Sequence, residues 1–109
     1  MSKASYWQRG ETLDYKNETE SVIEANTILK LGTRIGVAGT DIAPGEVGSV
    51  HVEGVYLMEK TGEAAIDLGA AVYFDGEGIT NTSTSNTPAG YAAAAAEAAD
   101  TTILVKLLG

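Results

Sequence analysis

Residues 49–58, SVHVEGVYLM, alternate between apolar and polar side chains with a period of two, and this stretch decides the fold class. The side chains on its apolar face are Val50, Val52, Tyr56 and Met58. His51 and Glu53 fall on the opposite face. Because successive side chains of a β-strand point to opposite sides, the pattern predicts a strand with one buried face. It favours a mainly β protein.

Turn residues divide the neighbouring sequence into further short strands. Pro44 and Gly45 mark a turn before the stretch. Asp75 and Gly76 follow it and lie between two β-prone runs, which is typical of a hairpin. The further strands expected after the stretch cover residues 71–74, 79–82 and 102–107. Short strands between glycine-rich turns predict a small, single-domain β-barrel or sandwich.

The alanine-rich segment 91–99 admits two interpretations. Alanine has the highest helix propensity, but the segment has no apolar stripe, and nine residues are too few for a helix that is stable by itself. Gly90 before the segment and Asp100 after it fit a strand and a turn equally well. We favour the strand and turn.

A weak internal repeat is also present. Residues 23–29 (IEANTIL) align with residues 66–72 (IDLGAAV), and residues 44–45 (PG) align with residues 88–89 (PA). Two copies are fewer than a solenoid needs, so the repeat would describe two similar halves of one barrel or sandwich. Chance similarity is the alternative.

The 109 residues leave room for one domain with one core. Residues 21–109 are predicted to form the β domain. Residues 1–20 are polar and charged, and we expect them to form a flexible N-terminal arm. Tyr6 and Trp7 in this arm either fold back on the domain or, with Arg9, bind a partner, because these residue types are favoured in interfaces.

The charge balance argues against nucleic acid as a partner. The chain has 15 acidic and 7 basic residues, a formal net charge of −8, and its basic residues are scattered. Binding to nucleic acid depends largely on clustered Lys and Arg. No membrane association is expected either, because no run approaches about 20 apolar residues and the N-terminus has no signal peptide. We expect the chain to be made and kept in a cytoplasm, unless it leaves as part of an assembly.

We expect no enzymatic activity, because none of the usual catalytic constellations is present. The chain has no cysteine, and His51 is its only histidine, which is too few ligands for a typical zinc site. Lys60 and Thr61 follow Glu59 instead of the glycine of a phosphate-binding loop. The carboxylates are spread along the chain. We therefore predict no catalytic residue, no metal ligand and no cofactor.

Several short stretches in a fixed order resemble a known family. They are residues 10–15, 41–48, 52–56, 68–75, 88–90 and 98–102, followed by the terminal strand. In this order they resemble the phage capsid decoration, or cement, proteins, a family catalogued as a domain of unknown function and often labelled a predicted recombinase of the RecA/RadA family. That label conflicts with the residues, because a strand-exchange ATPase needs a nucleotide-binding loop and a much longer chain.

The resemblance implies a structural virion protein. Such a protein would bind the outer capsid surface as a trimer, contact the phage major capsid protein, and stabilise the head after synthesis in the host bacterial cytoplasm. We expect Tyr6, Trp7 and Arg9 to contribute to capsid binding; the trimer interface cannot be placed from the sequence. The alternatives are another phage head or tail structural module and, less favoured, a recombination-associated protein.

Overall fold

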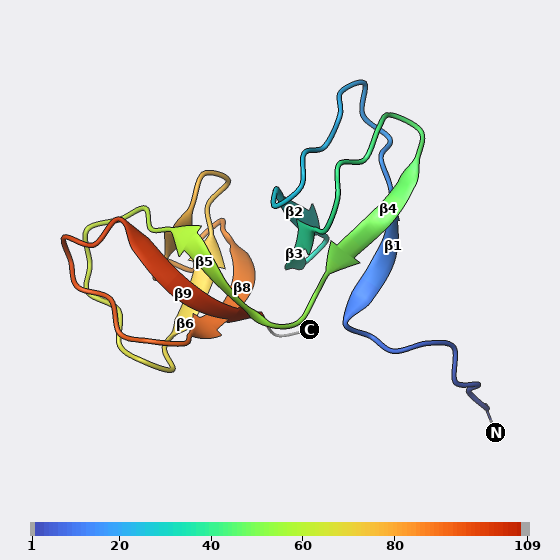
Figure 1. Cartoon of the computed structure of the whole chain (residues 1–109). Coiled ribbons are helices and arrows are strands. Elements are labelled where there is room, and N and C mark those ends of the chain that lie inside the picture. The colour runs from blue at the N-terminus through green and yellow to red at the C-terminus, as the bar shows by residue number, and fades with distance from the viewer. Residues whose placement is uncertain (1, 108–109) are drawn as a thin grey trace.

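Nine β-strands in two antiparallel sheets make up the computed structural model, which describes residues 2–107. The strands are β1 (Thr12–Lys16), β2 (Ile28–Leu31), β3 (Arg34–Ala38), β4 (Val47–His51), β5 (Val55–Glu59), β6 (Ala71–Phe74), β7 (Ile79–Thr80), β8 (Thr87–Ala92) and β9 (Thr102–Leu107). The first sheet has the order β1-β4-β3-β2 and the second the order β5-β9-β8-β6-β7 (Figure 1). The predicted mainly β class is confirmed. Its form is sandwich-like, because neither sheet closes into a barrel.

Met1 of the predicted arm, and Leu108 and Gly109 of the predicted β domain, lie outside the described residues. Between residues 2 and 107 the chain forms no helix. Those residues accordingly contain no helix long and apolar enough to cross a membrane.

The alternating stretch 49–58 forms two strands, not the single strand predicted. β4 ends at His51 and β5 begins at Val55, and the two strands belong to different sheets. Gly54 lies between them with a φ of +114°, a conformation that glycine adopts readily and other residues rarely adopt. The predicted burial is confirmed for the apolar face, which consists of buried Val50, Val52 and Met58 and half-buried Tyr56.

The strands predicted for residues 71–74 and 102–107 are confirmed as β6 and β9. The strand predicted for residues 79–82 is shorter in the structure, because β7 covers only Ile79–Thr80. β6 and β7 pair antiparallel across the predicted turn. Alternating side chains and the Asp-Gly pair were therefore sufficient to predict this part of the fold.

The side chain of Asp75 closes the turn between β6 and β7. Its carboxylate accepts a hydrogen bond of 2.6 Å from the hydroxyl of Thr61 and two, of 2.8 and 2.9 Å, from the backbone N–H groups of Gly78 and Glu77. The bond from Thr61, followed by those from the two backbone groups, lowers the pKa of Asp75 below its ordinary value of 3.8.

Asp75→Asn is expected to destabilise the protein slightly at neutral pH and to have little effect in acid. The folded-state pKa is depressed, so the carboxylate stabilises the fold above the ordinary pKa, and this contribution is lost as the pH falls through the folded-state value. Because Asp75 is exposed, we expect less than about 1 kcal/mol. Urea titrations of both proteins from neutral to strongly acidic pH test this; a difference in unfolding free energy that does not change with pH would contradict it.

The alanine-rich segment 91–99 contains no helix. β8 ends at Ala92, and the chain then bends so that Ala96 forms two backbone hydrogen bonds with Ile66, each of 2.8 Å. The favoured interpretation, strand and turn, is confirmed. Ala92 and Ala96 are both buried and belong to the hydrophobic core.

The two halves of the chain have the same architecture. β1, β4, β3 and β2 follow one another across the first sheet as β5, β9, β8 and β6 do across the second. In the first half Ile23 forms reciprocal backbone hydrogen bonds with Ile42, just as Ile66 does with Ala96 in the second half. The predicted alignment of residues 23–29 with residues 66–72 is therefore confirmed.

The other half of the predicted repeat is wrong. Pro88 lies inside β8, whereas Pro44 lies in the turn before β4. That turn is closed by a bond from the Glu46 N–H to the Ala43 carbonyl, and its counterpart before β9 is closed by a bond from the Asp100 N–H to the Glu97 carbonyl. Residues 98–99 thus correspond to residues 44–45. The β6–β7 hairpin and the loop after it have no counterpart in the first half, and this insertion shifts the alignment.

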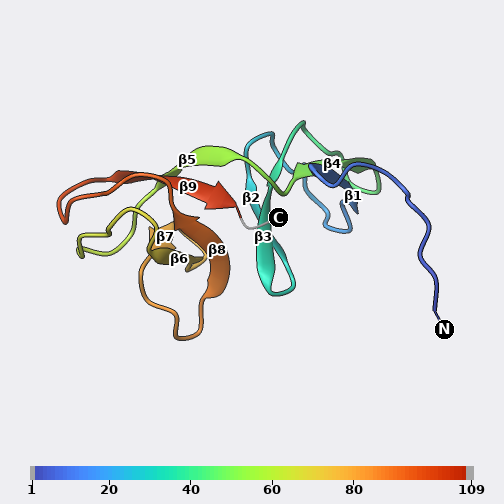
Figure 2. The same ribbon diagram turned by 90° about the horizontal axis from the view of Figure 1, so that it is seen from below.

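The predicted arm is shorter in the structure than residues 1–20. β1 lies within this range and pairs with β4 over five residues, and Asn17 is fully buried. The half-buried Tyr15 packs against the small core of the first half, which fixes this strand. Glu11 is still tied to the sheet, because its carbonyl accepts a hydrogen bond of 2.9 Å from the Val52 N–H, whereas residues 2–10 contain no strand and run away from both sheets (Figures 1 and 2). We keep the name arm for residues 2–10; its flexibility stays a prediction.

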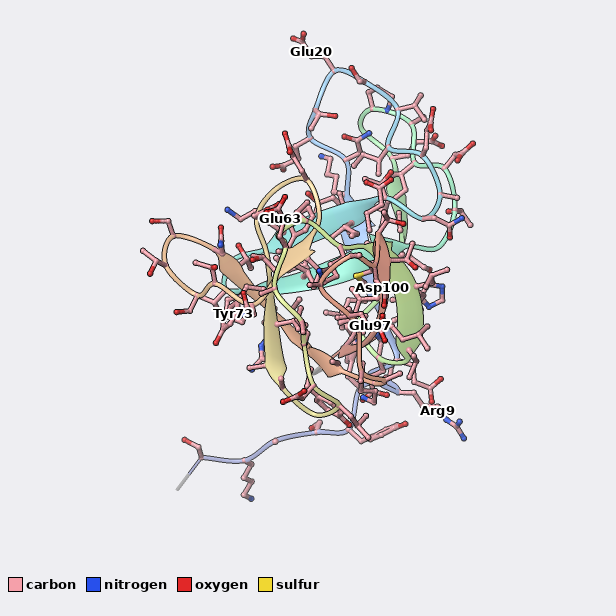
Figure 3. The ribbon with its side chains drawn as sticks, turned by 90° about the vertical axis from the view of Figure 1, so that its left-hand side faces the viewer. Arg9, Glu20, Glu63, Tyr73, Glu97 and Asp100 are labelled. Carbon is pink, nitrogen blue, oxygen red and sulfur yellow. The ribbon has the colours of Figure 1, made fainter. Side chains whose placement is uncertain are left out.

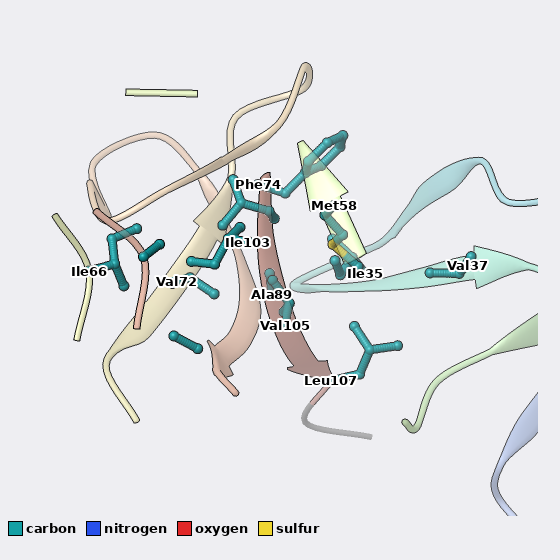
Figure 4. Close-up of a cluster of buried hydrophobic side chains, with 13 residues drawn as sticks. Ile35, Val37, Met58, Ile66, Val72, Phe74, Ala89, Ile103, Val105 and Leu107 are labelled. Atoms are coloured by element: carbon teal, nitrogen blue, oxygen red, sulfur yellow. The ribbon is translucent and has the colours of Figure 1, made fainter. Parts of the chain in front are cut away.

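One hydrophobic cluster joins the two sheets. β3 of the first sheet contributes Ile35 and Val37 to it, and the other members come from the second half (Figure 4). Those members are Met58, Ile66, Val72, Phe74, Ile79, Ala89, Ala92, Ala96, Ile103, Val105 and Leu107. A smaller cluster of Ile23, Ala38 and Ile42 fills the first half. The shared cluster holds the halves together, so the arm extends from a single body.

Candidate functional site

The arm presents two large aromatic side chains to solvent. Tyr6 is 84% exposed and Trp7 is 89% exposed. Arg9, also exposed, projects outward near the base of the arm (Figure 3). The structure therefore places all three predicted binding residues on one extended segment, and it does not fold Tyr6 or Trp7 back onto the domain.

The arm has the chemistry of a binding segment. Residues 2–10 contain Lys3 and Arg9 and no acidic residue, so they form a cationic segment of an acidic chain. Burying a Trp or Tyr side chain removes about 150–250 Å² of surface from water. Two such side chains and a guanidinium within four residues are able to bind an apolar surface with acidic groups beside it.

A groove of about 450 Å³ lies between β3, β5 and the β6–β7 turn. Its apolar lining includes Ile28, Val37, Tyr56, Met58 and Phe74. The ionisable side chains among its lining residues are Tyr56, Glu59 and Glu77, and burial raises the pKa of Tyr56. This lining combines an apolar floor with acidic groups and does not pair a nucleophile with a base.

His51 lies beside an aromatic ring. Its imidazole is half-buried, and its ring centre is 6.3 Å from that of Tyr56 at an interplanar angle of 40°. His51 lies on the polar side of the strand, as predicted, but the neighbouring sheet partly covers its side chain. Over residues 2–107 no group of three or more histidine, aspartate and glutamate side chains is close enough to hold a metal ion.

The sequence interpretation missed a second exposed apolar surface, on the outer side of β5, β9 and the end of β8 that pairs with β9. Its apolar members are Val55, Leu57, Tyr91 and Leu104. Leu57 and Leu104 are directly opposite in the register, and Leu57 is 67% exposed. We call these four residues, with Glu59 and Lys106 at the ends, the β5–β9 face. The signal that could have revealed it is that residues 55–58 and 103–105 are apolar on both sides of their strands.

The comparisons with known proteins gave one match. The family model described as phage cement protein matches residues 7–107, which include Trp7 and Arg9 of the arm and every strand of both sheets. Neither the curated proteins nor the solved structures contain a significant match to this chain.

Proposed function

Since this chain belongs to the phage cement protein family, which supports a structural role at the phage capsid, we propose that it binds the outer capsid surface as a trimer and stabilises the head. The observation that carries this proposal is the family match over nearly the whole described chain. The partner in the proposal is the major capsid protein, and the location is the surface of the virion. No catalytic step is part of the proposed role.

Trimerisation suits a protein of this size. One protomer of 109 residues offers a small contact area, and small contacts give weak binding. When three protomers are linked, the second and third contacts form at a high effective concentration, so weak individual contacts add to strong retention. A cement protein needs this retention, because it must stay attached while the shell is under load.

We propose the arm as the attachment segment. It is an exposed segment that combines two aromatic rings with a positive charge, whereas the whole chain carries a formal charge of −8. Its two aromatic rings would bury apolar area in the shell, and Arg9 would pair with an acidic group of the major capsid protein. A segment that becomes ordered on binding loses conformational entropy, so these contacts must also offset that cost.

The triple substitution Tyr6→Ala, Trp7→Ala and Arg9→Ala is expected to weaken attachment to shells at least about tenfold, because truncation of even one aromatic anchor commonly costs more than 1 kcal/mol. Co-sedimentation of the purified protein with undecorated shells measures the occupancy. The matched control replaces Ser2, Ser5 and Gln8 of the same arm by alanine and should retain wild-type occupancy. Unchanged occupancy of the first variant would remove the arm from the proposal.

Electron microscopy of the virion tests the location. Density for the protein on the outside of the head supports the proposal. Density on the tail or in a head fibre would replace the proposed role with that of another phage structural module.

A further inference from the structure

Because the two halves of the chain share one architecture, the residues of the β5–β9 face can be compared with those at the corresponding positions of the first half. In the first half the register places Thr12 opposite His51 and Asp14 opposite Ser49. At the corresponding positions of the second half Val55 is opposite Lys106 and Leu57 is opposite Leu104. One architecture thus has polar side chains at these positions in one half and mostly apolar side chains in the other.

The fold itself does not require the apolar residues. The first half forms the same pair of strands with Asp14 and Ser49 facing outward. Exposed apolar side chains gain nothing until their surface is removed from water. Leu57 and Leu104, side by side on a sheet surface, therefore indicate a surface that another molecule covers.

A third pair of corresponding positions supports this conclusion. Val37 on β3 continues the row of Thr12 and His51, and it is buried because the second sheet packs against it. The corresponding residue on β8, Tyr91, continues the row of Val55 and Lys106 and is 40% exposed. In the first half the second sheet covers this row of side chains. In the second half no described residue covers the corresponding row to the same extent.

We propose that a second copy of this chain covers the β5–β9 face, so that this face forms the contact between protomers around the axis of the trimer. The inference rests on the proposed trimer and names its interface. Leu57 and Leu104 are at the centre of the contact, with Val55 and Tyr91 beside them.

The charges of the face favour a second copy as the occupant. Two chains with a formal charge of −8 repel each other, so their contact must be poor in carboxylates. The face carries one acidic and one basic residue, and these lie at opposite ends: Glu59 opposite Thr102, and Lys106 opposite Val55. Four residues along β5 separate the two ends by about 13 Å. A cyclic trimer repeats one head-to-tail contact, in which the Glu59 end of one face can meet the Lys106 end of the face on the next protomer.

Light scattering of the purified full chain tests the interface. Wild type is expected at three times the 11.3 kDa of one chain, and Leu57→Asp at the mass of one chain at the same concentration. The matched control is Leu68→Asp, because Leu68 is about as exposed as Leu57 (66% against 67%) but lies in a loop outside the face. It should remain trimeric. Circular dichroism spectra identical to that of wild type establish that all variants are folded.

Exchange of the two charges is a second, gentler test. Glu59→Lys and Lys106→Glu are each expected to raise the dissociation constant of the trimer at least about tenfold, and the double variant should restore it. Restoration depends on the two residues meeting across the interface, so a purely structural role for either residue would not give this result.

Three results would overturn the interface: a monomeric wild type, a trimeric Leu57→Asp, or a double charge variant no tighter than the singles. If the capsid protein, and not a second copy, covers the face, Leu57→Asp stays trimeric and loses shell occupancy. The proposed attachment is judged separately by the shell occupancy of wild type. A wild-type trimer that does not bind shells ends the attachment proposal and leaves the interface in place.

Discussion

Gly90→Ala is expected to lower the free energy of unfolding by about 3 kcal/mol or more, because two separate costs fall on one residue. The φ of Gly90 is +144°, which residues with a side chain rarely adopt. A Cβ at this position would also overlap the carbonyl oxygen of Lys106 on the adjacent strand. Strain in the backbone typically costs about 1–3 kcal/mol, and forced overlap in a packed region costs about as much again.

The overlap at Gly90 cannot be relieved cheaply, because the atom it would meet belongs to the backbone. Lys106 lies in β9, which pairs with β5 on one side and with β8 on the other. Moving its carbonyl oxygen would disturb both pairings. A flexible side chain in the same place would rotate away, and the cost would then be limited to the backbone strain.

Gly76→Ala is the matched control for this experiment. Gly76 also has a positive φ, +99°, but a Cβ there would meet no atom within 4 Å. We expect it to cost about 1 kcal/mol, from conformation alone. Urea unfolding followed by circular dichroism gives both values. Equal costs for the two variants would show that the close approach of β8 and β9 contributes nothing.

Gly36 shows that this close approach belongs to the duplicated architecture. It precedes Ala38 by two residues, as Gly90 precedes Ala92, and both alanines accept a backbone hydrogen bond of 2.8 Å at corresponding positions. A Cβ on Gly36 would overlap the side chain of Val50 and lie 3.1 Å from the carbonyl oxygen of His51, the counterpart of Lys106. Both halves therefore need glycine at the same point. The sequence alone shows these residues only as two of 13 glycines.

Local patterns predicted the parts of the fold that depend on neighbours in sequence. β6, β9 and the β6–β7 turn follow from alternation and from the Asp-Gly pair, which act over a few residues. The division of residues 49–58 between two sheets could not be predicted, because alternation continues across Gly54 and only tertiary packing decides which sheet each part joins. β1 was missed for a similar reason: polar neighbours surround it, and its strand is fixed by pairing with distant β4.

The candidate surfaces were predictable to different degrees. Tyr6 and Trp7 stand out in the sequence because they lie in a polar segment, and the structure leaves both exposed. Leu57 and Leu104 do not stand out, since each lies in an apolar run that also supplies the core. Only the register, which places the two leucines opposite each other on the outer side, distinguishes them from Met58 and Ile103 on the inner side.

Asn17→Asp is expected to lower the free energy of unfolding by about 3 kcal/mol at neutral pH, although the two side chains have the same shape. Asn17 is fully buried, and its amide nitrogen donates to the carbonyl oxygens of Ser21 and Ile42, both at 2.8 Å. Its amide oxygen accepts from the N–H and the hydroxyl of Thr19. All four hydrogen-bonding positions of the amide are used. A carboxylate would place a buried negative charge against two carbonyl oxygens that have lost their donor.

The pH dependence separates this cause from a general loss of packing. Burial and the facing carbonyl oxygens would raise the folded-state pKa of an aspartate at position 17, so its cost to folding grows as the pH rises from the ordinary aspartate pKa to this raised value. The variant should therefore regain part of its stability as the pH falls and the carboxyl group binds a proton, which restores one donor. Asn86→Asp is the matched control, because Asn86 also donates to the carbonyl oxygen of a residue four positions away, Thr82, but near the surface. It should cost less than about 1 kcal/mol at any pH.

The second half supports a requirement for donors at this position. Lys60 follows β5 as Asn17 follows β1, and it is also buried. Its ammonium group donates to the carbonyl oxygens of Gly62 and Ala98, at 3.1 and 3.2 Å. An amide and an ammonium group share little except that both donate hydrogen bonds to the loops around them. If Asn17→Asp and Asn86→Asp cost the same and neither cost changes with pH, then shape and not donation holds the end of β1 in place.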